Sequence, residues 1–376
     1  MILSTVLGAL PGHAEPYRPT NDDQVLERLP QSWQGDTRLR ELRRLRGELA
    51  QDGEDLDLAL QLAHGYLEIG RSEADPRYLG YSQAALDPWW DLPQPPPGVL
   101  YVRALVHQNR HDFDTALEDL NRLVSQRPRH PRAWLNRAVI HLVRGDHLAA
   151  RASCLPLRRL DPLMASACQA SVGSLSGHAE SSYAMLRQAL ASFPAAEVGD
   201  RLWVLTGLAE IAHRLGRPDD AELHFKNALA LEQRDIYLLA AYADFLLDQD
   251  RPREVLVLLA GETRADALLL RRALAAVRLA TPRAKDLVAI LDARFAEGRL
   301  RGDSLHLGAE SRFRLHLLNQ PGAALRLALD NWAIQREPID ARHVLEAALA
   351  AGDREASQPV IDWLDRSGLE DMRLAA

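Results

Sequence analysis

Residues 131–162, PRAWLNRAVIHLVRGDHLAARASCLPLRRLDP, decide the fold of this chain. The first half places three residues on one face of a helix, namely Trp134, Ala138 and His141. Gly145 and Asp146 then supply a turn. The second half repeats the helical spacing with Ala150, Cys154 and Leu157, before Pro162 ends it. The stretch therefore predicts two short helices joined by a tight turn.

The same pattern recurs at a spacing of 34 residues, the length of two short helices and two turns. Pairs of alanines and prolines carry this period: Ala104 and Ala138, Ala209 and Ala243, Ala116 and Ala150, and Pro128 and Pro162. Units begin near residues 97, 131, 202 and 236, with a less regular unit at 163–194. A lone unit cannot bury its apolar face, so we expect the units to stack.

The repeated unit resembles the tetratricopeptide repeat, which has bulky residues at positions 4, 11 and 24, small ones at 8, 20 and 27, and Gly near 15. Two departures are Arg137 at the usual Leu of position 7 and His141 at the usual Tyr of position 11. The resemblance covers about residues 97–260 and implies an all-α, right-handed α-solenoid. Weaker helical pairs at both ends bring the expected total to eight or nine. The few aromatic residues, 6%, agree with an all-α chain.

Five segments are expected along the chain. They are a signal-peptide remnant at 1–14, an extended N-terminal arm at 15–35, a degenerate first repeat with a Pro-rich linker at 36–96, well-formed tetratricopeptide repeats at 97–262, and degenerate C-terminal helical repeats at 263–376. We interpret the proline-rich run from Pro88 to Pro97 as rigid and non-helical. Trp89 and Trp90 in this run are expected to cap the core, the alternative being a hot spot for a partner.

In the family that this chain resembles, the first helices of successive repeats line a concave groove that binds a peptide or protein. The family's groove positions fall on Tyr101, Leu105, Arg132, Asn136, Val139, Trp203, Glu210, His213, Tyr237 and Asp244. Asn136 matches an Asn that some members use to hold an extended backbone. No Lys stands at these positions and Glu210 and Asp244 would repel a carboxylate, which implies a peptide or helix of basic character. The alternative is a merely solvated groove lining.

Residues 1–14, MILSTVLGALPGHA, are typical of the back half of a secretory signal peptide. An apolar run is followed by Gly12 and Ala14, small residues at −3 and −1 of a cleavage point after Ala14. No basic residue precedes the run, which a start codon assigned too late would explain. We expect a scaffold or adaptor exported to the bacterial periplasm or secreted. A cytoplasmic adaptor or regulator of the same fold is the alternative.

No catalytic motif is found: the sequence has no Gly-rich phosphate loop, no HExxH and no nucleophile elbow. We therefore expect a protein that is not an enzyme and uses no cofactor. His107 and His111 have the i,i+4 spacing of a metal site, with Asp112 and Asp114 nearby. Because His107 stands at position 11, a packing position, we favour packing, and a metal-handling protein is a remote alternative.

The two cysteines, Cys154 and Cys168, lie on either side of the turn at Asp161 and Pro162. On neighbouring antiparallel helices they would stand at nearly the same height, so a disulfide is expected if the protein is exported. The alternative is that they are two small buried hydrophobic residues.

Charge and hydropathy exclude two classes of partner. Lys and Arg number 45 against 52 Asp and Glu, a net charge of −7, which does not favour nucleic acid. No run of 18 apolar residues follows the N-terminal segment, so no membrane span is expected.

Overall fold

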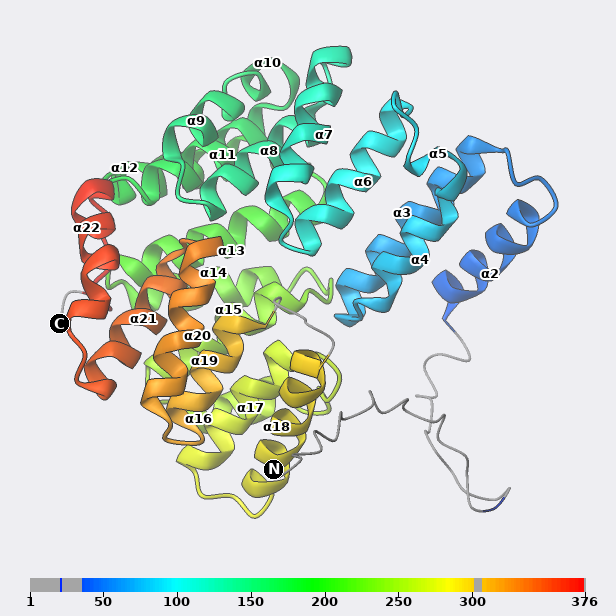
Figure 1. Cartoon of the computed structure of the whole chain (residues 1–376). Coiled ribbons are helices and arrows are strands. Elements are labelled where there is room, and N and C mark those ends of the chain that lie inside the picture. The colour runs from blue at the N-terminus through cyan, green and yellow to red at the C-terminus, as the bar shows by residue number, and fades with distance from the viewer. Residues whose placement is uncertain (1–20, 22–35, 301–305, 375–376) are drawn as a thin grey trace, which may run out of the picture.

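The computed structural model describes residue 21 and residues 36–300 and 306–374, in which every regular element is a helix (Figure 1). The predicted signal-peptide remnant at 1–14 and, apart from residue 21, the predicted arm at 15–35 lie outside these residues. An initial helix, α2 (Thr37–Leu49), precedes a series of antiparallel pairs. The predicted all-α fold of paired repeats is confirmed.

Nine pairs follow one another in the described part of the chain. They are α3 (Leu56–Glu73) with α4 (Arg77–Ala85), α6 (Pro97–Asn109) with α7 (Phe113–Gln126), α8 (Pro131–Val143) with α9 (His147–Cys154) and α10 (Leu157–Leu160), α11 (Pro162–Ser174) with α12 (Ala179–Ser192), α13 (Val198–Arg214) with α14 (Pro218–Leu229), α15 (Ile236–Asp248) with α16 (Pro252–Leu258), α17 (Asp266–Arg278) with α18 (Ala284–Leu300), α19 (Leu307–His316) with α20 (Pro321–Ile334), and α21 (Pro338–Ala351) with α22 (Gln358–Ser367).

The recurring alanines lie at the seams between paired helices. Ala138 on α8 and Ala150 on α9 are fully buried, and so are their equivalents in other units, Ala104, Ala116, Ala209 and Ala243. A methyl group at these positions lets two backbones approach closely, while bulky residues such as Leu120 and Phe225 fill the space beside them. The 34-residue period thus records helix packing.

A residue with positive φ follows every first helix, within three residues of its end. These residues are Ala74, His111, Gly145, Gly177, Gly216, Asp250, Ala280, Asn319 and Gly352. The left-handed conformation reverses the chain into the second helix, and glycine adopts it without steric cost. The sequence predicts this cap where Gly stands at position 15, and the structure shows that His, Asp, Asn and Ala occupy the same conformation in other units.

Prolines change two elements from the prediction. Pro156 interrupts the second helix of the 131–162 unit, which divides into α9 and α10, because proline has no backbone N–H to donate into the helix. Residues 87–90, part of the stretch predicted to be non-helical, form one turn of helix, α5 (Asp87–Trp90). Trp90 is buried in the core of the first units and Trp89 packs against that core, as the capping interpretation expects.

The stack coils until distant units meet. The backbone N–H of Arg336, before α21, donates to the carbonyl of Val143 at the end of α8, at 2.7 Å. The N–H of Met372 donates to the carbonyl of Arg214 at 3.0 Å. Near the other end, the guanidinium of Arg234 donates to the carbonyl of Ser72. Figure 1 shows α22 beside α12, with α19–α21 in front of α13–α15.

Candidate functional site

The predicted groove residues fall into two groups with different surroundings. Tyr101 and Asn136 belong to the first group, on neighbouring first helices α6 and α8. The Asn136 side-chain amide donates to the Tyr101 hydroxyl oxygen at 3.0 Å. The Tyr101 ring also lies 4.8 Å from the ring of His130 and 5.9 Å from that of His64 on α3, measured between centroids. A polar, aromatic surface therefore runs across three successive units.

Leu105 and Val139 extend this surface by one helical turn on α6 and α8, and both are half-buried. Arg132, at the start of α8, is exposed and reaches Asp200 on α13 at 3.5 Å. An exposed pair at this distance stabilises little, and its guanidinium keeps donors available to another ligand. We call Tyr101, Leu105, Arg132, Asn136 and Val139 the α6–α8 surface.

Burial sets the protonation of the aromatic side chains at this surface. It raises the pKa of Tyr101, although the hydrogen bond from Asn136 opposes the rise. It lowers the pKa of His64 and of His130. His130 Nδ1 also accepts the backbone N–H of Ala133 at 3.1 Å, so the neutral ring carries its proton on Nε2. The surface thus presents neutral donors and acceptors beside one arginine.

The second group lies where the later units close on themselves. Asp244 on α15 accepts hydrogen bonds from Arg271 on α17 at 2.5 Å and from Arg312 on α19 at 2.6 Å. Burial alone would raise the pKa of Asp244, but the two guanidinium groups hold it well below its usual value. The sequence implies that Asp244 would favour a basic peptide, and in the structure the chain itself supplies two cations to this carboxylate.

The other predicted residues of this group are also engaged within the chain. The Tyr237 hydroxyl donates to Glu210 at 2.7 Å, and the Glu210 charge raises the pKa of Tyr237 well above its usual value. Buried His213 lies 3.6 Å from Asp248, which accepts from Arg342 on α21 at 2.8 Å. These contacts join α13, α15 and α21.

Trp203 on α13 is half-buried against the largest hydrophobic core. Its environment therefore favours packing over the presentation of a ring to a partner.

Sequence reasoning missed the arginines that fill the inner side of the later units. They are Arg271, Arg312 and Arg342, near the start of α17, α19 and α21, and Arg373 after α22. The three helical arginines stand five or six residues into their first helices, the positions from which Asn136 was chosen in its unit. If the family's groove positions are carried past residue 260, they include these three arginines. In the structure the arginines pair with Asp244 and Asp248.

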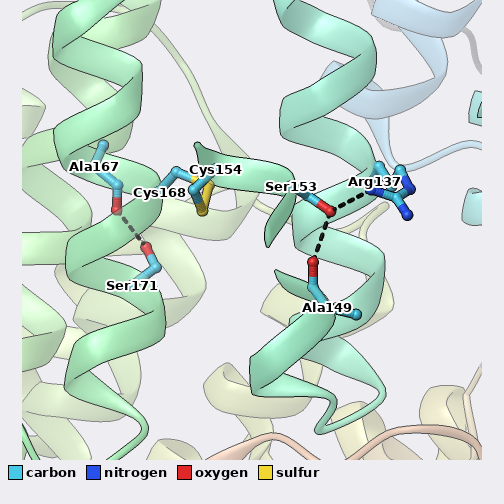
Figure 2. Close-up of a disulfide and its surroundings, with 7 residues drawn as sticks. All are labelled: Arg137, Ala149, Ser153, Cys154, Ala167, Cys168 and Ser171. Atoms are coloured by element: carbon cyan, nitrogen blue, oxygen red, sulfur yellow. Dashed lines mark hydrogen bonds between the residues drawn. A yellow bond between two sulfur atoms is a disulfide. The ribbon is translucent and has the colours of Figure 1, made fainter. Parts of the chain in front are cut away.

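A disulfide joins Cys154 at the end of α9 to Cys168 on α11, with the Cα atoms 5.7 Å apart (Figure 2). Both residues are buried. Arg137, the departure at position 7, lies on the other side of α9. Figure 2 shows its guanidinium donating to Ser153 Oγ, at 2.9 Å, and it also donates to Asn121 on α7 at 2.7 Å. Arg137 therefore ties its helix to both neighbours.

The histidine spacing does not produce a metal site on one helical face. His107 lies on α6, whereas His111 follows the helix end with φ of 59°. His107 Nδ1 pairs with Asp112 Oδ2 at 2.9 Å, and the His111 ring stacks on Phe113. Among the described residues, no group of three or more His, Cys, Asp or Glu side chains could hold a metal ion.

Comparison with known proteins agrees with the geometry. Residues 101–165 match the family model described as tetratricopeptide repeat. The chain therefore contains tetratricopeptide repeats in this region. Proteins of this kind are typically interaction scaffolds, usually non-catalytic, that bind protein partners. No described helix is long and apolar enough to cross a membrane. No curated protein sequence matches the chain.

Several solved structures are similar to the chain. A tetratricopeptide repeat protein from Parabacteroides merdae ATCC 43184 has 13% identity and a TM-score of 0.43, with 69% of this chain and 94% of that chain covered. The APC/C hetero-tetramer Cut9-Hcn1 has 18% identity and a TM-score of 0.41, with 83% and 60% covered. Yeast Tom70 has 16% identity and a TM-score of 0.41, with 89% and 63% covered. The chain thus spans less than two thirds of the latter two.

Proposed function

We propose that this tetratricopeptide repeat protein is a scaffold or adaptor that binds an extended peptide or protein segment along the α6–α8 surface. The observation that carries the proposal is the contrast between the two groups of groove residues. Around α13, α15 and α21 the polar side chains pair with the chain's own arginines and carboxylates. On the α6–α8 surface, Tyr101, Asn136 and Arg132 keep hydrogen-bonding capacity beyond their mutual contacts.

The chemistry of this surface indicates what it would recognise. Asn136 and Tyr101 together can donate to and accept from a peptide backbone, while Leu105 and Val139 offer small apolar contacts one turn away. Arg132 adds one positive charge, and the carboxylates of Asp200 and Glu197 lie 3.5 and 4.0 Å from its guanidinium. The surface therefore suits an uncharged segment, unlike the basic ligand that the sequence implies from Glu210 and Asp244.

Site-specific cross-linking in cells would test the proposal. A photoreactive residue at Leu105 or Val139 should capture a partner, and the matched probe at Leu148, 83% exposed on α9, should not. Tyr101→Ala or Asn136→Ala should reduce the yield at Leu105 severalfold, because each removes a central contact. Capture at Leu148 alone, or yields that neither substitution changes, would contradict binding at the α6–α8 surface.

We also propose that the protein works in the bacterial periplasm or outside the cell. The apolar N-terminal run and the Cys154–Cys168 disulfide support this, since disulfides persist in oxidising compartments. Thiol alkylation of intact cells, followed by N-terminal sequencing of the purified protein, would test it. Export predicts protected cysteines and loss of residues 1–14. Alkylated cysteines together with an intact N-terminus would favour a cytoplasmic adaptor instead.

A further inference from the structure

A polar cavity of about 140 Å³ lies between the first helices of the last units, and none of its lining residues belongs to the α6–α8 surface. Helices α15, α17, α19 and α21 each contribute to its wall. Leu274 and Leu317 supply part of an apolar side. The polar side consists of Arg278, Arg312, His316, Arg342, His343, Asp248 and Glu346, and His316 lies 3.0 Å from Glu346. A concave site with a few converging polar groups is the usual form of a small-molecule site.

The charges around the cavity do not cancel. Arg342 lies between Asp248, at 2.8 Å, and Glu346, at 2.7 Å. Arg278 donates to the carbonyl of Leu247 at 2.7 Å but forms no ion pair with any residue that the structure describes. With the histidines left out, the charged wall residues and their ion-pair partners are four arginines against three carboxylates: Arg278, Arg312, Arg342 and Arg373 against Asp244, Asp248 and Glu346. The next ion pairs outward add one of each, Arg271 and Asp371. One positive charge is left over, and Arg278 carries it.

His343 provides a second, independent observation. Its side chain is 8% exposed and lines the cavity, and neither ring nitrogen has a hydrogen-bond partner among the described residues. A buried polar group without a partner costs free energy, so such groups are rare in native proteins. A neutral imidazole always carries one N–H, and a ligand oxygen in the cavity would satisfy it.

We propose that this cavity binds a small organic carboxylate with a single negative charge. One uncompensated arginine matches a monoanion and disfavours a cation. The planar guanidinium of Arg278 suits a carboxylate, to which it can donate two parallel hydrogen bonds. The His343 N–H would donate to an oxygen of the same ligand, while Leu274 and Leu317 accommodate a short hydrocarbon chain. The cavity volume restricts the ligand to a few carbon atoms.

Calorimetric titration of the full-length protein with sodium butyrate would test the proposal, with sodium chloride at equal ionic strength as the reference. Saturable heat is expected for butyrate alone. Arg278→Gln should weaken binding by about tenfold or more, since it removes a charge-assisted contact while keeping a donor for Leu247. Arg253→Gln, at an exposed arginine outside this cavity, is the matched control and should bind as the parent does.

Two further measurements make the outcome decisive. His343→Phe should also weaken butyrate binding, and thermal unfolding of each variant shows whether it is folded. N-acetyl-Ala-Ala carries the same carboxylate at the end of a peptide, so it distinguishes a free acid from a chain terminus. The proposal fails if butyrate gives no saturable heat, if folded Arg278→Gln binds it unchanged, or if only the peptide binds.

Discussion

At the scale of single residues, the departures from the repeat pattern have local physical reasons. Arg137 replaces a core leucine because Ser153 and Asn121 on the adjacent helices offer acceptors for its guanidinium. His111 replaces the turn glycine and adopts the left-handed conformation that the turn requires. The sequence shows that these positions are unusual. It does not show which side chains accept the hydrogen bonds of Arg137, because those acceptors lie 16 residues away on neighbouring helices.

Glu337 gives a pH dependence at the same scale. Burial and the nearby carboxyl groups of Asp340 and Glu210 raise its pKa to about 8. The folded protein therefore holds a proton that the unfolded chain releases from about pH 4.5, so this group's contribution to stability falls as pH rises through 8. Burial lowers the pKa of His213 to about 4, so the contribution of His213 to stability rises with pH instead. That rise is confined to the range between about pH 4 and its unfolded pKa of 6.5. His343, with its pKa lowered to about 3, does the same.

Urea unfolding at pH 6.5, 7.5 and 8.5 measures this effect, since the two histidines contribute little above their unfolded pKa of 6.5. The free energy of unfolding should fall by about 1–2 kcal/mol over this range, at 1.36 kcal/mol for each pKa unit. Glu337→Gln should flatten the decline, whereas Glu118→Gln, at an exposed position on α7, should leave it unchanged. An equal decline in the Glu337 variant would assign the pH dependence to other groups.

At the scale of helices, the sequence predicts most of what the structure contains. Alanines repeating every 34 residues are buried at the seams, and the degenerate C-terminal repeats expected at 263–376 correspond to the pairs α17–α18, α19–α20 and α21–α22. Helix packing requires small residues at fixed intervals, and that requirement is local enough to be visible in the chain. Pro156, which divides α9 from α10, is a local signal of a helix break that the repeat pattern does not contain.

The seam at Ala138 offers a test of this packing. Ala138→Leu inserts three carbon atoms where α8 and α9 are in contact, so the free energy of unfolding should fall by about 1–3 kcal/mol. Ala152→Leu, on the exposed side of α9, is the matched substitution and should change it by less than about 0.5 kcal/mol. Chemical denaturation of the two variants beside the parent gives both values. Similar values for the two would mean that the seam is not closely packed.

At the scale of the whole molecule, the sequence predicts a groove but not its closure. The contacts that close the coil join residues more than 60 positions apart, such as Arg312 with Asp244 and Arg342 with Asp248. A repeat pattern describes only neighbouring units, so it contains no information on how far the stack coils. Half of the predicted groove residues consequently lie inside the chain's own contacts, and the α6–α8 surface is what the closure leaves to a partner.

The segment after α22 should hold this closure in place. Glu370 accepts the backbone N–H of Ala179 at 2.6 Å, Met372 donates to Arg214, and Arg373 lies 3.9 Å from Asp248. The carbonyl oxygen of Gly368 lies 3.3 Å from where a Cβ on Gly177 would stand, so the two backbones meet without side chains between them. Ending the chain after Gly368 removes the three polar contacts, each worth about 1 kcal/mol.

Hydrogen exchange of the shortened chain should therefore show faster exchange in α13 and α15, because the Arg214 carbonyl and the Asp248 carboxylate lose partners from the C-terminal segment. Exchange in α6 and α8 should stay as in the parent, since their surface makes no contact with this segment among the described residues. Arg366→Ala, at an exposed position on α22, is the control and should leave both regions unchanged. Uniformly faster exchange would mean that the repeats unfold as one unit, and unchanged exchange in α13 and α15 would mean that the coil closes without the segment. Only the selective result supports a coil held shut by its own C-terminus while a separate surface remains open to a partner.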